Sequence, residues 1–149
     1  MCLWHPRHEV PSGTIGLVEM VEVGTSTHCL RLSREPGSQN YLSAELRLPG
    51  LSARTDVYEF NGFESLADFF SGMVADWRGW QGVREWESLE GDMRIEATHD
   101  GGHIQLRVTL RRNTPFGWHG EGWVTTAELV LEPGEQLRGI ADELRDLVA

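Results

Sequence analysis

Residues 77–112 have the sequence WRGWQGVREWESLEGDMRIEATHDGGHIQLRVTLRR, and this stretch decides the fold that we predict. Apolar and polar residues alternate in 92–98 and again in 103–112, which is the pattern of strands with one buried face. Asp100-Gly101 between them is a favoured turn sequence. The two segments are therefore predicted to pair as an antiparallel hairpin at the centre of a sheet.

The register of this hairpin depends on the length of its turn. A two-residue turn at Asp100-Gly101 sets Arg94 opposite Arg107, whereas a four-residue loop sets Glu96 opposite Arg107. Like charges directly opposite each other destabilise a pair of strands, and opposite charges stabilise it. The charges favour the four-residue loop, although the two-residue turn is the commoner geometry.

Strand-like segments continue from this hairpin toward both ends of the chain. Each contains alternating apolar residues and is bounded by glycine or Pro-Gly turns, as strands commonly are. Because 41–48 and 52–60 are separated only by a short Pro-Gly turn, they should pair as a second antiparallel hairpin. The further segments expected to form strands are 14–23, 27–34, 83–91 and 118–131.

Two segments carry a helical stripe of apolar residues at spacings of three and four. The first helix is predicted to start at a capping box made by Asn61 and Glu64 and to stop at Gly79. The second is expected to open at Pro133, because proline suits a first helical turn. The stripes consist of Leu66, Phe69, Phe70, Met73, Val74 and Trp77 in the first helix, and of Leu137, Ile140, Ala141, Leu144 and Val148 in the second.

Four strands, a helix, three or four strands and a second helix predict an α+β domain. We expect a single twisted antiparallel sheet of about seven or eight strands, with both helices packed on one face. A pseudo-repeat of hairpins, each closed by a helix, is an alternative. Trp77, Trp86 and Trp123 should lie in the core. The 149 residues suffice for one domain, 1–149, in which 1–13 should be loosely ordered.

The net charge of −10 disfavours two classes of partner. Nucleic-acid backbones and anionic membranes would repel an acidic chain, so neither is expected to bind. A basic protein could be steered by this charge, although acidity also serves solubility. No apolar run reaches the roughly 20 residues that span a bilayer, and the N-terminal residues lack a signal-peptide pattern. We therefore expect a cytoplasmic protein, with Cys2 and Cys29 as reduced thiols.

The turn HDGGH is the strongest candidate for chemistry. Its His99, Asp100 and His103 could serve acid–base catalysis or hold a metal. With a carboxylate from residues 85–92, they would suit a small hydrolase or a metal-dependent enzyme. Asp-Gly is also simply a favoured turn, and no nucleophile, phosphate loop or metal-binding motif accompanies it. We therefore expect turn chemistry here, with no catalytic residue, no metal and no cofactor.

Aromatic side chains in loops are the other candidates, as anchors for a protein partner. They fall in predicted loops or near strand ends, where a partner can reach them. The sequence leaves the partner's identity and the oligomeric state open. The residues predicted to bind a partner are Trp80, His99, Asp100, His103, Trp118 and His119.

Three segments give the chain a family resemblance: WRGW at 77–80, WESLEGDMRIEATHDGGHIQLRV at 86–108 and LEPGEQLRGIADEL at 131–144. Through them, residues 40–149 resemble an actinobacterial family of uncharacterised domains. Those domains are similar in turn to the WapI-type immunity proteins of contact-dependent toxin systems. The resemblance implies an α+β domain that binds a protein and neutralises a toxin by covering its active site. It supplies no catalytic residues.

Three functions remain in competition. The first is a non-enzymatic protein-binding domain with an immunity-like role against a toxin partner. The second is the small hydrolase or metal-dependent enzyme that would use His99, Asp100 and His103. The third is a structural domain that dimerises through a sheet edge. The acidic charge, the lack of a catalytic set in the sequence and the resemblance favour the first.

Overall fold

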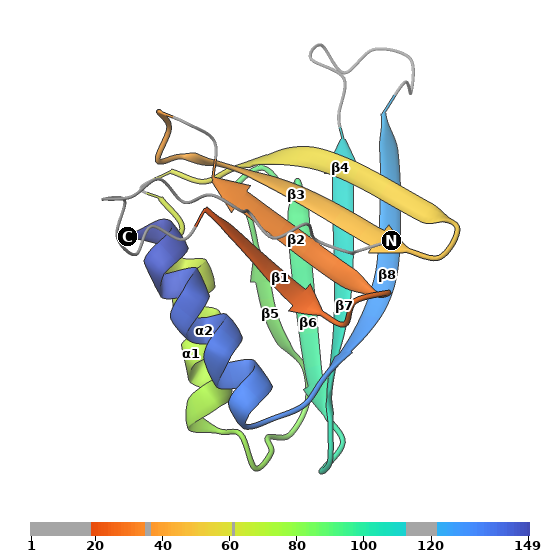
Figure 1. Ribbon diagram of the computed structural model, residues 1–149, viewed down its shortest axis with the longest axis vertical. Helices are drawn as coiled ribbons and strands as arrows, with labels where there is room; N and C mark the ends of the chain where they lie inside the picture. Colours follow the sequence, from red (N-terminus) through yellow and green to blue (C-terminus); the bar gives the residue numbers. More distant parts are fainter. Residues whose placement is uncertain (1–18, 35–36, 61, 113–121) are drawn as a thin grey trace.

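The computed structural model describes residues 19–34, 37–60, 62–112 and 122–149. In these residues the chain forms four strands, a helix, four further strands and a second helix (Figure 1). The first group comprises β1 (Met20–Gly24), β2 (Cys29–Arg34), β3 (Tyr41–Leu48), β4 (Leu51–Tyr58) and α1 (Glu64–Ala75). The second group comprises β5 (Arg84–Glu87), β6 (Met93–His99), β7 (Ile104–Arg112), β8 (Trp123–Leu131) and α2 (Glu135–Val148).

The strands form two antiparallel sheets rather than one. The first sheet has the order β1-β2-β3-β4 and the second the order β5-β6-β7-β8, so strands adjacent in the chain pair within each sheet. Figure 1 shows the first sheet crossing in front of the second, with α1 and α2 side by side along one side of the pair. The prediction of a single sheet of seven or eight strands is therefore wrong. The α+β class and the antiparallel pairing are confirmed.

The width of the apolar surface explains why one sheet does not form. Eight strands in one sheet would span about 38 Å at about 4.8 Å a strand. Two helices packed about 10 Å apart would cover only about half of that face. In the structure the two sheets and α2 contribute to one shared core, to which Leu32 on β2, Leu106 on β7 and Leu144 on α2 all belong. Each sheet therefore covers apolar surface that the helices alone would leave exposed.

A hydrogen bond also joins the two sheets directly. The Thr55 hydroxyl on β4 donates to the Arg111 carbonyl oxygen on β7 at 3.2 Å. Thr55 is buried, so its hydroxyl needs a partner inside the protein. This bond satisfies the hydroxyl and fixes β4 against β7.

The central hairpin has the register that the charges favoured. Glu96 lies opposite Arg107 and His99 lies opposite Ile104, so residues 100–103 form the loop between β6 and β7. The four-residue loop is therefore confirmed. The second predicted hairpin is confirmed as well, since β3 and β4 pair along their whole length.

Both helices bury the predicted stripe, with corrections at their ends. On α1, Leu66, Phe70 and Met73 are fully buried. The N-cap of α1 is Phe63, which makes no side-chain capping hydrogen bond, so the helix does not start from the predicted capping box. Asn61 itself lies outside the described residues.

Trp77 is the main correction in the core. Helix α1 ends before it, and Trp77 is 44% exposed instead of buried. Trp86 is buried, as predicted, whereas Trp123 is only partly buried against the core. On α2 the fully buried residue of the last turn is Leu147, while Val148 is partly buried.

Three further expectations concern the first strand, the cysteines and the membrane. The strand predicted at 14–23 is described only from residue 19 and forms β1, whereas residues 1–13 lie outside the described residues. Cys29 is disulfide-bonded, so the expectation of reduced thiols is wrong. No helix in the described ranges is long and apolar enough to cross a membrane.

Candidate functional site

Four of the residues predicted to bind a partner meet at one end of the molecule. Trp80 lies in the loop between α1 and β5, and His99 lies at the end of β6. Their rings are 5.1 Å apart and meet edge to face. Asp100 and His103 belong to the turn that follows β6. Figure 1 places this turn and the α1–β5 loop together at the lower end of the molecule.

Both ring nitrogens of His99 are occupied by the backbone. Nδ1 lies 2.9 Å from the Gly101 amide nitrogen, and Nε2 lies 2.8 Å from the Trp77 carbonyl oxygen. Since an amide N–H can only donate and a carbonyl oxygen can only accept, Nδ1 accepts and Nε2 carries the proton. The imidazole is therefore held as one neutral tautomer that fastens the turn to the α1–β5 loop. Neither nitrogen is left for a substrate or a metal.

Asp100 is committed to the same turn. Its Oδ1 accepts hydrogen bonds from the backbone N–H groups of Gly102 at 2.8 Å and of His103 at 2.6 Å. The bond from Gly102, followed by the bond from His103, lowers the pKa of the Asp100 carboxyl because both stabilise the carboxylate. Asp side chains commonly close tight loops in this way. The carboxylate therefore holds the loop closed.

The other groups that an enzyme would need here are engaged elsewhere. Glu85 and Glu87 on β5 both form ion pairs with Arg94, the one to Glu87 at 3.5 Å. His103 Nε2 lies 3.1 Å from Glu132 Oε1, and both side chains are exposed. Among the described side chains, no group of three or more His, Cys, Asp or Glu could hold a metal ion. Within the described ranges, no group of free acidic and basic side chains therefore surrounds the turn.

Arg84 on β5 contacts both the α1–β5 loop and the end of α1. Its guanidinium carbon lies 4.5 Å from the centroid of the Trp80 ring, which is a cation–π distance. The same guanidinium donates to the Gly72 carbonyl oxygen at 3.1 Å and to the Asp76 carboxylate at 2.5 Å. Trp80 is partly buried, and its Nε1–H is buried without an acceptor in the described part of the chain. The contacts of Arg84 hold the α1–β5 loop against β5 and the end of α1.

Trp77 also lies between α1 and β5. It was not among the residues predicted from the sequence to bind a partner. Its carbonyl oxygen is held by His99, while its side chain is 44% exposed. The Arg78 guanidinium carbon lies 5.1 Å from the centroid of the Trp77 ring. Helical spacing assigned Trp77 to the core because the predicted helix ran on to Gly79, whereas α1 ends at Ala75. Exposed Trp and Arg side chains are the types that most often anchor protein partners.

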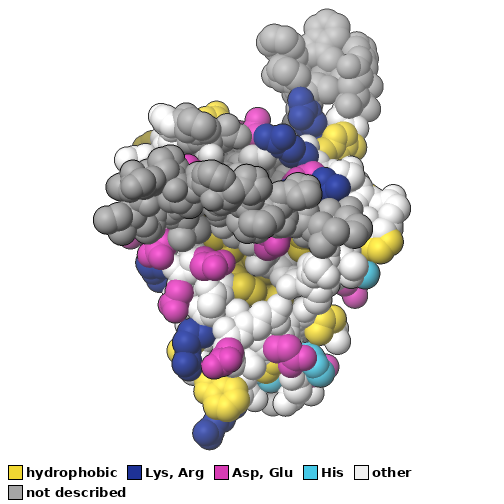
Figure 2. Space-filling view, in the orientation of Figure 1, with side chains coloured by type: hydrophobic (Ala, Val, Ile, Leu, Met, Phe, Trp, Pro, Cys, Tyr) yellow, Lys and Arg dark blue, Asp and Glu magenta, His cyan; other side chains and the backbone are white. Residues whose placement is uncertain are grey.

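We call this end of the molecule the tip surface. Figure 2 shows hydrophobic, basic, acidic and histidine side chains at the lower end of the visible face. Trp118 and His119, which complete the predicted set, lie outside the described residues. The tip surface consists of Trp77, Arg78, Trp80, His99, Asp100 and His103.

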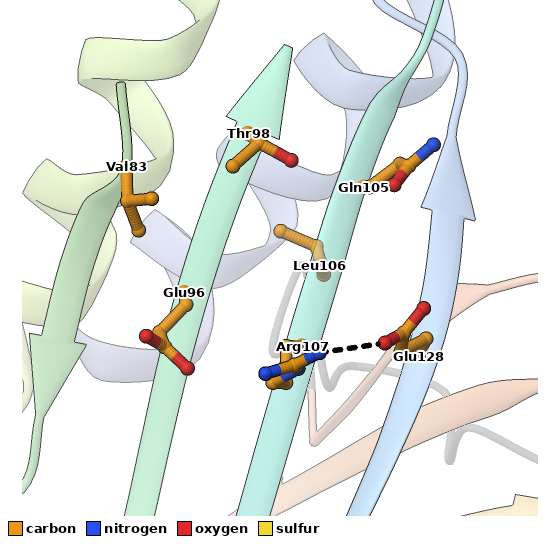
Figure 3. A pocket seen from close by; sticks show the side chains of 7 residues that line it. All are labelled: Val83, Glu96, Thr98, Gln105, Leu106, Arg107 and Glu128. Atoms are coloured by element: carbon orange, nitrogen blue, oxygen red, sulfur yellow. Dashed lines mark hydrogen bonds and ion pairs between the residues drawn. The ribbon is translucent and has the colours of Figure 1, made fainter. Parts of the chain in front are cut away.

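A shallow cavity of about 230 Å³ lies elsewhere, on the outer face of the second sheet (Figure 3). Arg107 on β7 donates to Glu128 on β8 at 3.0 Å, so these two charges are already paired. Ligand pockets usually enclose about 300–1,000 Å³, and this hollow is smaller. We therefore place the candidate site at the tip surface. The cavity is lined by Val83, Glu96, Thr98, Gln105, Leu106, Arg107 and Glu128.

Comparison with known proteins identifies the family of the chain. No curated protein and no solved structure matches it. A family model does match, over residues 21–149, and this range includes the whole tip surface. The chain therefore belongs to DUF6228, a family of unknown function.

Proposed function

We propose that this chain is a non-enzymatic protein-binding domain and that the tip surface contacts its partner. The observation that carries the proposal is Trp77, a large aromatic side chain held in solvent on a fixed backbone. Trp and Arg dominate the binding energy of many interfaces, because they bury a large area and also form polar contacts. Trp77 and Arg78 together offer this combination.

Preorganisation of the loop supports the proposal. The Asp76 amide donates to the Gly72 carbonyl oxygen at 3.2 Å, and the Gly79 amide donates to the Asp76 carbonyl oxygen at 2.9 Å. With the bond from His99 to the Trp77 carbonyl oxygen, they fix the backbone on both sides of the indole. A loop whose backbone is already ordered loses little conformational freedom when a partner binds. The energetic cost of binding at this loop is therefore low.

The kind of partner forms the second part of the proposal. The resemblance to WapI-type immunity proteins, by way of an actinobacterial domain family, supports an immunity-like role in which the partner is a toxin domain. The net charge of −10 supports a partner with a basic surface, since opposite charges accelerate association. In this role the chain would neutralise the toxin by covering its active site.

A binding titration with a tip variant tests the proposal. The toxin-like product of a neighbouring gene is purified and titrated against the full chain by calorimetry. Trp77→Ser should weaken binding by about 30-fold or more, which corresponds to the roughly 2 kcal/mol of a hot-spot residue. The matched control is Val124→Ser, because Val124 is 58% exposed on β8 and lies opposite Arg111, at the end of the strand away from the tip surface.

The control variant should bind with the affinity of the wild type. Equal affinity of the Trp77→Ser variant would contradict the proposal, as would the absence of any toxin-like neighbour that binds the chain. If the partner's activity also persists in the complex, the immunity-like role fails while protein binding stands. A complex of two copies of this chain alone would support dimerisation instead.

The sequence predicts a cytoplasmic location, whereas the disulfide bond of Cys29 favours an oxidising compartment, because disulfides are rare in the cytoplasm. Alkylation of thiols immediately on cell lysis distinguishes the two. Two free thiols per chain support the cytoplasm, and a protected disulfide contradicts it.

A further inference from the structure

A second exposed apolar surface lies at the opposite end of β6 from the tip surface. It forms where the end of β4 meets the turn between β5 and β6. The Glu59 carboxylate accepts a hydrogen bond from the Leu89 amide at 3.0 Å, which joins these two segments. Tyr41 and Tyr58 lie opposite each other on β3 and β4, with ring centroids 5.2 Å apart. The aromatic patch, as we call it, consists of Tyr41, Tyr58, Phe60 and Leu89.

Three side chains of the aromatic patch are open to solvent. Phe60 and Leu89 are each 62% exposed, and Tyr41 is 43% exposed. Single exposed apolar residues are ordinary on protein surfaces, but several on adjoining segments are typical of interaction sites. A partner that covered these side chains would remove a substantial apolar area from water.

Acidic side chains border the aromatic patch. Asp56 shares the outer face of β4 with Tyr58, and Glu90 follows Leu89 in the β5–β6 turn. Burial raises the pKa of Asp92 and a backbone hydrogen bond from Tyr58 lowers it. The negative charge of Glu90 raises this pKa, the positive charge of Arg111 lowers it, and the negative charge of Asp56 raises it. These effects require the acids to lie within one another's field. The acidic border consists of Asp56, Glu59, Glu90 and Asp92.

We infer that the aromatic patch and its acidic border dock a basic segment of a partner protein, in which an apolar side chain lies between arginines or lysines. The apolar side chain covers Phe60 and Leu89, while the cations lie over the acidic border. Charge complementarity selects this partner, because the border and the net charge of −10 both repel an acidic one. The inference goes beyond the proposed function, since it concerns the opposite end of the molecule.

Titration with a synthetic peptide tests this inference. The probe is a fluorescein-labelled peptide of repeated Arg-Arg-Leu, and its anisotropy is measured against the full chain at low ionic strength. The peptide should bind, and added salt should weaken the binding because it screens the exposed charges. A peptide of repeated Glu-Glu-Leu has the same apolar content and should not bind.

Two sets of variants locate the peptide on the chain. The double variant Phe60→Ser and Leu89→Ser should weaken binding by about tenfold or more, because the apolar contact is lost. The double variant Glu59→Gln and Glu90→Gln keeps the acceptor for the Leu89 amide, and it should weaken binding and flatten its salt dependence. The controls Trp77→Ser at the tip surface and Val130→Ser on β8 should bind like the wild type.

The inference is overturned if the wild type does not bind the Arg-Arg-Leu peptide or binds the Glu-Glu-Leu peptide equally well. Unchanged affinity in both patch variants overturns it too, as does a loss that appears only in the Trp77→Ser control. Circular dichroism establishes that each variant folds. If the serine double variant does not fold, the Glu59 and Glu90 variant decides. The proposed function fails separately, when Trp77→Ser leaves the affinity for the toxin-like partner unchanged.

Discussion

A histidine at a hairpin tip can bind a metal or hold a loop, and the hydrogen bonds of His99 give it the second role. The residue types His99, Asp100 and His103 could be read from the sequence as a turn, and the hydrogen bonds of Asp100 agree with that prediction. The second partner of His99, the Trp77 carbonyl oxygen, is 22 residues away in the chain. No local pattern predicts such a contact, because it depends on how the α1–β5 loop packs against the hairpin.

The charge of Asp100 gives a pH-dependent prediction. Its pKa is lowered in the folded state, so the carboxylate stabilises the fold at pH values above its unfolded pKa of about 3.9. This contribution is lost as the pH falls through the folded pKa. Asp100→Asn keeps the acceptor oxygen of the turn and removes the charge. The wild type should therefore be more stable than the variant at neutral pH, with a difference that shrinks below about pH 4.

Urea unfolding of both proteins across this pH range measures the difference. The substitution leaves the rest of the chain unchanged, so other titrating groups cancel in the comparison. A difference that stayed constant, or that grew on acidification, would show that the carboxylate charge does not support the turn.

At the scale of elements, the sequence predicted which segments form strands and helices better than where they stop. The apolar stripe of α1 correctly identified Leu66, Phe70 and Met73 as buried. The same spacing also included Trp77, because the spacing of apolar residues does not show where the helix ends. The register of β6 and β7 could be predicted, since it depends on the charges of neighbouring strands.

The end of α1 can be tested by two alanine substitutions on the predicted stripe. Phe70→Ala removes a fully buried ring and should lower the free energy of unfolding by about 3–5 kcal/mol. Trp77→Ala removes an exposed one and should lower it by less than about 1 kcal/mol. Chemical denaturation of both variants measures this contrast. Similar losses from the two would place Trp77 in the core after all.

At the scale of the whole molecule, the sequence could not predict which apolar faces meet. Alternation shows that a strand such as β7 has one buried face, with Ile104, Leu106 and Val108 on it. The pattern is the same whether that face packs on a helix or on another sheet. The chain order, four strands and then a helix, occurs twice, and each group of four strands forms a sheet of its own.

The shared core predicts that neither half folds alone. A chain truncated after Trp80 keeps β1 to β4 and α1, but it loses β5 to β8 and α2, which complete the core. Its apolar sheet face would be exposed to water, so the fragment should lack a cooperative thermal transition. Circular dichroism melting and the spread of amide signals in an NMR spectrum measure this. A fragment that melts cooperatively, as the full chain should, would make the two sheets independent units.

The length of strand β6 also sets the distance between the tip surface and the aromatic patch. Its seven residues, Met93–His99, extend for about 23 Å at about 3.3 Å a residue, and the tip surface and the aromatic patch lie beyond its two ends. A partner whose contact is confined to one end of β6 leaves the other end uncovered. Two different proteins could then be held in a ternary complex at a constant separation, with this chain as the spacer between them.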